Sequence, residues 1–267
     1  MSTVRIATDG WVVAKRNLIK IKRVPEIMVF VLMSPIMFVL LFAYVFGGAI
    51  DAGPGLDYKE FLIGGIFAQT VVFGATYSGA ALAEDMQKGL IDRFRSLPMA
   101  RSAVLVGRTT SDVVYNVVSL IVMALTGLLV GWRARGSILE TIAAFGLLLL
   151  FAYAISWVMA YIGLLVPSVD VINNASFMVI MPLTFVSNAF VPLESFPSGL
   201  QTVVEWNPVS AITQAVREMF GNVPEGMAVP DVWSMQNPAL YSLLWVGIIL
   251  VVFVPLSVRQ YQRATSR

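Results

Sequence analysis

Six long apolar stretches, separated by short polar segments, make up most of this chain. A helix needs about 20 residues to cross the hydrocarbon core of a bilayer, and each stretch is close to that length. Gly, Pro and Ser inside the stretches suit membrane helices, because neighbouring helices satisfy the backbone groups that they free. We therefore predict an all-α integral membrane protein with six transmembrane helices. The predicted spans cover residues 27–46, 61–83, 113–132, 141–165, 173–191 and 239–256.

The segment before the first span, residues 1–25, has the pattern of an amphipathic helix. Its apolar residues recur at three-and-four spacing, and its basic residues cluster off that stripe. This pattern is typical of a helix that lies on an anionic cytoplasmic leaflet. Such a helix can be a topology anchor alone, or it can also pack against a cytoplasmic partner. The apolar stripe consists of Val4, Ala7, Trp11, Ala14, Leu18 and Ile21.

The segment 192–237, between the fifth and sixth spans, is the longest stretch that does not cross. It is too polar to span the membrane and too apolar to float free in water. Two prolines each precede a helix-like run, as Pro does at the first position of a helix. We predict two short helices at the outer interface that re-enter the leaflet. The residues singled out in this region are Phe196, Pro197, Trp206, Asn207, Pro208 and Arg217.

The composition supports a membrane protein and narrows its chemistry. Hydrophobic residues make up 58% of the 267 residues and charged residues 13%, with a mean hydropathy of +0.80, whereas a soluble domain is about 25% charged. One transmembrane domain, residues 1–267, is therefore predicted. The absence of Cys and His excludes disulfides, thiol nucleophiles, Cys/His zinc sites and His acid–base chemistry. There is no P-loop motif for ATP, and residues 1–25 lack the apolar core of a signal peptide.

The distribution of Lys and Arg predicts the orientation of the chain. With the N-terminus in the cytoplasm, the outer segments carry only Lys59, Arg133, Arg135 and Arg217, of which Arg133 and Arg135 oppose the rule. The inner segments carry many more, namely Arg5, Lys15, Arg16, Lys20, Lys22, Arg23, Lys88, Arg93, Arg95, Arg101, Arg108, Arg259, Arg263 and Arg267. This asymmetry predicts that both termini are cytoplasmic.

The loop 84–102, between the second and third spans, combines charges with a short apolar stripe. Its two acidic residues stand where a helix would begin, which suits the helix dipole. Three apolar residues then follow at i, i+4 and i+7 on one face of a short helix. Such a helix fits a groove in a soluble partner, and the alternative is a helix that lies on the lipid surface. The predicted docking residues are Glu84, Asp85, Leu90, Arg93, Phe94, Arg95 and Leu97.

Polar groups at membrane depth are neutral in the predicted spans. No Asp, Glu, Lys, Arg or His lies near the middle of any of them, although proton-driven transporters need such a residue. The energy source is therefore predicted to be a partner. Neutral polar groups can line a path for an amphipathic substrate, or they can simply bond across helices. The predicted path, from spans two and five, consists of Gln69, Phe73, Tyr77, Phe177, Thr184 and Asn188.

Two separated segments resemble the signature of ABC-2-type permeases. In the loop 84–102, the acidic start is followed by Lys88-Gly89, Leu90-Ile91-Asp92-Arg93 and Leu97-Pro98. The stretch from Pro182 contains Phe190-Val191-Pro192-Leu193, Phe196-Pro197, Leu200-Gln201, Asn207-Pro208 and Ala215-Val216-Arg217. Six spans, cytoplasmic ends and a basic first helix agree over the whole length. Within the family, the chain resembles most the daunorubicin-resistance-type drug export permeases, and nodulation-factor and polysaccharide exporters share much of the pattern.

The resemblance implies the permease of an ABC exporter of the ABC-2, or type V, arrangement. The loop 84–102 would be the coupling helix that docks on a separate ATPase, and ATP and Mg would bind that partner and not this chain. Two ATPases and two permeases, the second a copy or a relative, would form the transporter in the plasma membrane. The implied cargo is an amphipathic drug-like molecule or a lipid, with a polysaccharide or lipo-oligosaccharide as the alternative. Membrane lipids are expected partners, and nucleic acid is not.

Two other classes of function remain open on the sequence. A membrane-embedded enzyme acting on lipids needs a catalytic constellation, for which Asp170 beside Asn173 and Asn174 is a poor candidate without His or Cys. A structural or immunity-type membrane protein would use the loop 84–102 for docking only. The identity of the cargo is not readable from neutral, apolar spans.

Overall fold

The computed structural model describes residues 14–15, 19, 33, 35–46, 57–89, 103–166, 168–223 and 230–264. Within these ranges the chain forms helices and turns, with no strand. A short apolar helix, Pro35–Val45, overlaps the π-helix η1 (Phe42–Phe46). The remaining helices are α3 (Tyr58–Gly74), α4 (Thr76–Gln87), α6 (Ala103–Val130), α7 (Ile138–Gly163), α8 (Val169–Phe185), η2 (Leu193–Ser195), α9 (Ser198–Glu205), α10 (Pro208–Phe220), α11 (Trp233–Gln236) and α12 (Pro238–Ala264).

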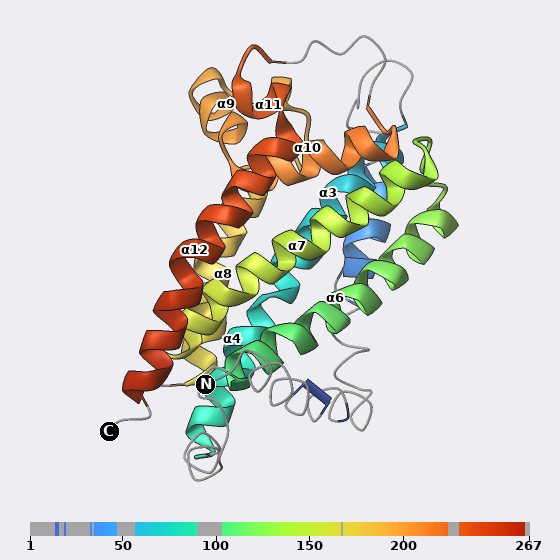
Figure 1. The fold of residues 1–267 in the computed structure, drawn as a ribbon. Helices are drawn as coiled ribbons and strands as arrows, with labels where there is room; N and C mark the ends of the chain where they lie inside the picture. Colours follow the sequence, from blue (N-terminus) through green and yellow to red (C-terminus); the bar gives the residue numbers. More distant parts are fainter. Residues whose placement is uncertain are drawn as a thin grey trace.

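The long helices form a bundle around α7, which contacts α3, α4, α6, α10 and α12. Helices α6, α7 and α12 run along one side of the bundle, and α10 lies across one end of it (Figure 1). We call the end with α9, α10 and α11 the upper end. The end where α4 and α12 finish is the lower end (Figure 1). The α3–α4 segment is the most enclosed, with 83% of its apolar window buried, whereas α12 is peripheral with 17%.

Among the described residues, four helices are long and apolar enough to cross a membrane: the continuous α3–α4 segment, α6, α7 and α12. They correspond to the second, third, fourth and sixth predicted spans. The first and fifth predicted spans correspond to shorter apolar helices, Pro35–Val45 and Val169–Phe185. The all-helical prediction is confirmed for the described residues, while the count of six crossings stays a prediction. Most of the amphipathic segment 1–25 lies outside the described residues.

The third predicted span began ten residues too late. Helix α6 starts at Ala103 and therefore includes Arg108 and Asp112, which hydropathy alone had left in the loop. The two side chains pair with each other, Arg108 Nη2 lying 3.4 Å from Asp112 Oδ1. Their i,i+4 ion pair within α6 compensates for burial, and a hydropathy pattern does not register it.

The fifth predicted span ends six residues too late, because α8 stops at Phe185 and the chain then turns. The carbonyls of this turn are satisfied from α10 and not by a further helical turn. Asn207 Nδ2 donates to the carbonyls of Leu183 and Val186, at 2.7 and 2.6 Å. A helix can end inside a bundle only where its last carbonyls find such partners, so α10 fixes the end of α8.

Glycine permits the closest approach between α4 and α7. A Cβ on Gly163 would lie 2.5 Å from the carbonyl oxygen of Gly79, a contact too short for any real side chain. The same crossing brings Gly79 against the Met159 carbonyl. The hydrophobic effect does not drive helices together inside lipid, and small residues let their backbones come close enough for van der Waals packing. Backbone contact therefore sets the distance between α4 and α7.

Replacing Gly163 with alanine is expected to lower the free energy of unfolding by about 1–3 kcal/mol, because overpacking forces the two backbones apart. Gly146, also on α7, provides a matched control since a Cβ there meets nothing within 4 Å. Thermal unfolding of both variants in detergent measures the difference. A Gly163→Ala protein as stable as Gly146→Ala would contradict the close crossing.

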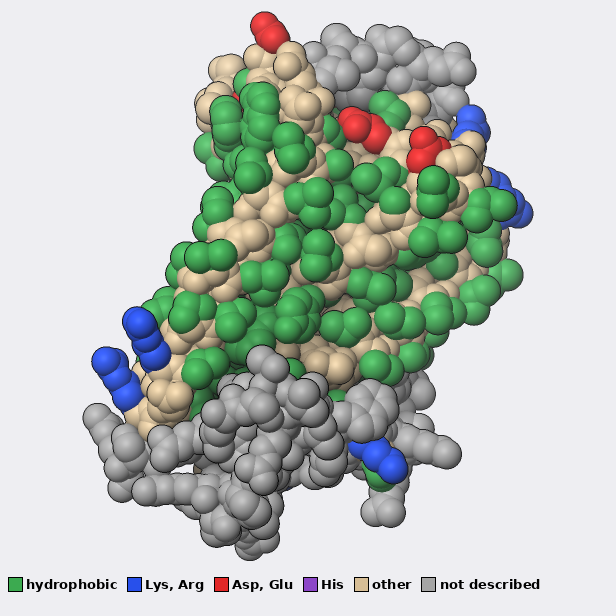
Figure 2. Space-filling view, viewed as in Figure 1, with side chains coloured by type: hydrophobic (Ala, Val, Ile, Leu, Met, Phe, Trp, Pro, Cys, Tyr) green, Lys and Arg blue, Asp and Glu red, His purple; other side chains and the backbone are tan. Residues whose placement is uncertain are grey.

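The exterior of the bundle has the pattern of a membrane protein. Figure 2 shows apolar side chains covering the middle of the face formed by α6, α7 and α12, with charged side chains at the two ends. At the upper end, Arg135 Nη2 lies 2.9 Å from Glu60 Oε2, whose side chain is 8% exposed. Arg135 opposes the predicted excess of cations on the inner side, and this ion pair gives a physical reason for its position in an outer segment. The exposed apolar residues include Ile121, Leu125, Leu129, Ile248 and Val251.

Candidate functional site

A cavity of about 300 Å³ opens between α3, α4, α6 and α8. A second cavity of about 400 Å³ shares Phe73, Thr76, Tyr77 and Phe177 with it. Ligand pockets commonly have volumes of about 300–1,000 Å³, so the pair offers room for a small organic molecule. The described residues that line the first cavity are Pro35, Phe38, Gln69, Thr70, Phe73, Gly74, Thr76, Tyr77, Tyr115, Ser119, Phe177 and Met181.

Four of the six residues predicted for a substrate path line this cavity: Gln69, Phe73, Tyr77 and Phe177. The structure does not bring Thr184 and Asn188 to it. Thr184 is buried near the end of α8. Asn188 lies in the turn that follows, where its backbone N–H donates to the Ser210 hydroxyl at 3.2 Å. Asn188 lies beyond the end of α8 at Phe185, although the fifth predicted span included it.

Helix α6 contributes a wall that the path prediction had assigned to spans two and five alone. Tyr115 and Ser119, one turn apart, line the cavity from α6. The Tyr115 ring lies 5.4 Å from that of Tyr77 on α4, centre to centre. Ser119 carried a signal in the sequence as a neutral polar residue inside a span. Tyr115 carried none, because only the packing of α6 places it opposite Tyr77.

The cavity wall is aromatic and neutral. The Phe73 and Phe177 rings meet edge to face at 6.0 Å. The Thr70 hydroxyl donates to the Ile66 carbonyl of its own helix, and the Thr76 hydroxyl donates to the Phe73 carbonyl at the end of α3, at 2.7 Å each, so both offer little to a ligand. No Asp, Glu, Lys or Arg is among the described lining residues. Such a wall suits an amphipathic molecule with a large apolar body.

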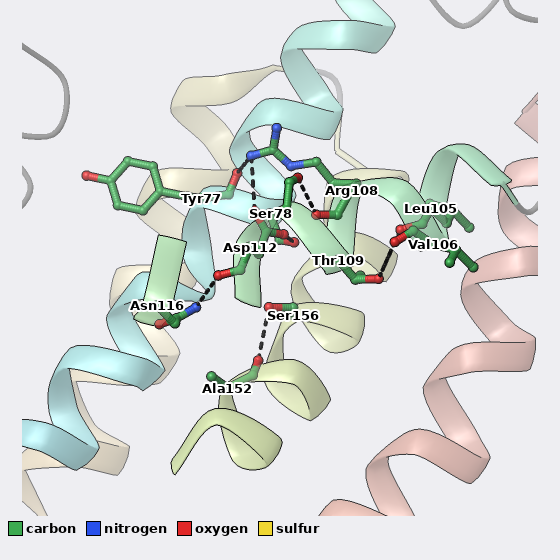
Figure 3. A network of polar contacts seen from close by, with 11 residues as sticks. Tyr77, Ser78, Leu105, Val106, Arg108, Thr109, Asp112, Asn116, Ala152 and Ser156 are labelled. Atoms are coloured by element: carbon green, nitrogen blue, oxygen red, sulfur yellow. Dashed lines mark hydrogen bonds and ion pairs between the residues drawn. The ribbon is translucent and has the colours of Figure 1, made fainter. Parts of the chain in front are cut away.

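A polar network connects α4 to α6 directly below the cavity (Figure 3). The Ser78 hydroxyl donates to Asp112 Oδ2 in a short contact. Arg108 Nη2 donates to the Tyr77 carbonyl at 3.1 Å and pairs with Asp112. Asp112 is 4% exposed. We call Ser78, Arg108 and Asp112 the α4–α6 polar link. The sequence prediction missed it, because it placed both charges outside the third span.

A second polar centre lies at the upper end, where Arg217 of α10 is 1% exposed. Its Nε donates to the Phe61 carbonyl, and Nη1 and Nη2 donate to the Asn188 and Ala189 carbonyls, all at 2.8 Å. The guanidinium also lies over the Phe61 ring at 3.5 Å. A Cβ on Gly64 would lie 2.7 Å from Arg217 Cγ, so glycine makes room for the side chain. Arg217 thus joins α3, α10 and the turn after α8.

The other residues singled out at the upper end form helix ends and turns. Pro197 is the N-cap of α9, and Pro208 is the first residue of α10, as predicted. Asn207 caps α10, with its Oδ1 accepting from the Val209 N–H at 2.8 Å. Trp206 follows α9 and is half exposed, and its carbonyl accepts from the Tyr241 hydroxyl at 2.9 Å. The Phe196 carbonyl accepts from Gln201 Nε2 at 2.8 Å. The two predicted helices are present, and their re-entry into a leaflet stays a prediction.

The acidic pair of the predicted docking loop lies in a different place from the one expected. Glu84 and Asp85 belong to the last turn of α4 and do not begin a new helix, so that prediction was wrong. The helix ends because Gly89 adopts φ +63°, a conformation suited to a helix C-terminus. A hydrogen bond from Lys88 to Glu84 raises the pKa of the Lys88 ammonium. Leu90, Arg93, Phe94, Arg95 and Leu97 lie outside the described residues.

Long apolar helices, an apolar outer face and charged ends define a polytopic membrane protein, and the neutral cavity between its helices could hold an apolar molecule. The model of the ABC-2 type transporter family matches residues 8–220. The chain therefore belongs to the ABC-2 type transporter family, and it is a permease homologous to drug-resistance exporters.

Relatives agree with this assignment. The daunorubicin resistance ABC transporter permease protein DrrB1 of Streptomyces coeruleorubidus is 34% identical over 251 residues, covering 94% of this chain and 85% of that protein. The probable doxorubicin resistance ABC transporter permease protein DrrC of Mycobacterium tuberculosis is 26% identical over 196 residues, covering 73% and 67%. A putative transport permease, ycf38, of Cyanophora paradoxa is 25% identical over 215 residues, covering 79% and 74%.

Proposed function

We propose that this chain is the transmembrane permease subunit of an ATP-driven exporter that moves an amphipathic drug-like molecule or a lipid out across the plasma membrane. A separate ATPase, in two copies, binds and hydrolyses ATP with Mg. Two permeases, identical or related, complete the transporter. Both termini lie in the cytoplasm, and the lower end of the bundle faces that side.

The neutral cavity between α3, α4, α6 and α8 carries this proposal. It offers aromatic and aliphatic surface with a few neutral polar groups, which fits a cargo that is apolar over most of its area. Four of the six residues that the sequence predicts for a substrate path line this cavity. The relatives named for daunorubicin and doxorubicin resistance support a drug-like cargo.

The position of α4 supports a partner that drives the cycle. Tyr77 of the cavity and Glu84 at the helix end belong to the same helix, so displacement of the loop after Gln87 moves the cavity wall. We propose that the loop 84–102 docks on the ATPase. The apolar stripe of Leu90, Phe94 and Leu97 would fill a groove of the ATPase. The charged residues around this stripe would be Glu84, Asp85, Arg93 and Arg95. Alternating access then follows from a rigid-body movement of helices.

Reconstitution tests this function. We expect the affinity-purified protein from its native membrane to carry an ATPase, and the pair in vesicles to move the uncharged dye Nile red with Mg-ATP. The purified permease alone should hydrolyse no ATP, because it has no P-loop. NBD-labelled phosphatidylcholine in place of Nile red distinguishes a lipid cargo from a drug-like one.

Two results would refute the proposal. ATP hydrolysis that survives complete removal of the partner would place catalysis on this chain. Chemical conversion of the labelled lipid by the purified permease would indicate a lipid-modifying enzyme. ATP-driven movement of neither probe, with export of an oligosaccharide instead, would favour the alternative cargo.

A further inference from the structure

In the α4–α6 polar link, both members of a charged pair, Arg108 and Asp112, lie on the membrane helix α6. Asp112 is 4% exposed and the Arg108 side chain is 16% exposed. Carrying two charges into an apolar bundle costs free energy that well-packed apolar residues would not cost. Ionisable residues in membrane helices therefore point to a functional role. The cavity is neutral, so binding of cargo does not account for this pair.

The link spans two helices that otherwise have little contact. Helix α4 packs mainly on α7 and α8 and only lightly on α6, whereas α6 packs well on α3, above the link. The hydrogen bonds between them run from the Ser78 hydroxyl to Asp112 and from Arg108 to the Tyr77 carbonyl (Figure 3). Asn116 Nδ2 donates to the Asp112 carbonyl at 2.9 Å, which fixes the turn that carries the carboxylate. Below these bonds, Leu82 and Leu105 belong to one buried apolar cluster. The polar bonds therefore give the lower halves of the helices a directional connection beside this apolar packing.

The link stands between the loop and the cavity. Helix α4 leads into the segment after Gln87, and α6 emerges from it at Ala103. Tyr77 precedes Ser78, and Tyr115 lies one turn beyond Asp112, so the link also fixes the two tyrosines at the lower side of the cavity.

We propose that Asp112 is a positioning residue for transport: held by Ser78 and Arg108, it makes the lower halves of α4 and α6 move as one unit. A displacement of the loop then moves Tyr77 and Tyr115 together and does not merely separate α4 from α6. This inference rests on the proposed function, because it takes the loop to be driven by an ATPase. It goes beyond that function by naming the residues that transmit the movement.

The test uses Ser78→Ala, which removes the side-chain hydrogen bond between the helices and leaves the Arg108–Asp112 pair and the Arg108 bond to the Tyr77 carbonyl. Ser156→Ala is the matched control, since this buried hydroxyl on α7 donates only to the Ala152 carbonyl of its own helix. In the reconstituted complex, Ser78→Ala should bind the ATPase normally. Nile red moved per ATP hydrolysed should fall about tenfold, the effect of losing a hydrogen bond to a charged acceptor. Ser156→Ala should behave as the unmodified protein.

A covalent replacement separates positioning from simple packing. The chain has no Cys, so Ser78→Cys with Asp112→Cys introduces the only thiols. The reduced double variant should be uncoupled, and bridging the thiols with the short cross-linker dibromobimane should restore transport per ATP. If the cross-link blocks transport, the helices must separate during the cycle and the inference is wrong.

A measurement without the ATPase keeps this inference separate from the proposed function. Spin labels at Gln87 and Val106 of the purified permease report the distance between the lower ends of α4 and α6. The distance distribution should broaden in Ser78→Ala and stay narrow in Ser156→Ala. An unchanged distribution in Ser78→Ala overturns the inference whatever the transport result. Failure of the unmodified complex to transport, with the broadening present, counts against the proposed function alone.

Discussion

Arg217→Met is expected to abolish most of the folded protein recovered from membranes. The substitution keeps an apolar stem of similar length but leaves the carbonyls of Phe61, Asn188 and Ala189 without their donor inside the bundle. Hydrogen bonds to a charged group contribute about 1.5–3 kcal/mol each, and a native protein is stable by only about 5–15 kcal/mol. We expect the midpoint of thermal unfolding in detergent to fall by on the order of 10 °C or more.

Two variants control for the effect of Arg217→Met. Arg133→Met removes an exposed cation at the same end, one that donates only to backbone carbonyls close in sequence, and should change the midpoint little. Arg217→Lys keeps the positive charge without the planar fork, so it should recover only part of the loss. If Arg217→Met unfolds at the same temperature as Arg133→Met, the three bonds do not hold the upper end together.

Phe94→Ala is expected to separate the permease from its ATPase. In the proposed docking mode, this ring enters a groove of the ATPase together with Leu90 and Leu97. Burying a Phe side chain contributes roughly 1.5–3 kcal/mol, so its loss should weaken docking by about one to two orders of magnitude. The variant should insert and fold normally, because the sequence places the residue in the loop 84–102 and not in a predicted span. The ratio of ATPase to permease after affinity purification measures the effect.

Phe196→Ala is the control for Phe94→Ala, since it removes a ring at the upper end, away from the loop. Its ATPase recovery should equal that of the unmodified protein. If the loop helix lies on lipid and does not dock, the ATPase stays bound in Phe94→Ala as well. Equal recovery from both variants would therefore remove the basis for the coupling assignment.

The two variants test opposite ends of the protein and different parts of its design. Arg217 acts within the bundle, where a buried cation is tolerated because backbone carbonyls and a ring face surround it. Phe94 acts, in our proposal, at the surface of a partner. Loss of fold with Arg217→Met and loss of docking with a normal fold in Phe94→Ala would distinguish a structural hub from a contact site.

Hydropathy identified the chain as a membrane protein. Apart from the third span, whose start was ten residues too late, the predicted spans overlap helices of the structure, and most of their ends agree within a few residues. Such spans are predictable because a run of apolar residues has to be helical in lipid, where no water satisfies the backbone. The positions of Pro197 and Pro208 likewise predicted the starts of α9 and α10, since proline suits the first turn of a helix. Spans two and five were predicted to line the substrate path, and this prediction contained four residues that line the cavity: Gln69, Phe73, Tyr77 and Phe177.

Tertiary structure alone decided where charge is tolerated and where helices end. Asp112 and Arg108 lie inside α6 because Ser78 and the Tyr77 carbonyl, on another helix, compensate for their burial. The end of α8 at Phe185, beyond which Asn188 lies, depends on donors from Asn207, the N-cap of α10, and from Arg217 of α10. Hydropathy sums each residue's own preference for lipid, whereas the cost of a buried charge or an open carbonyl depends on a partner that only the fold brings within reach.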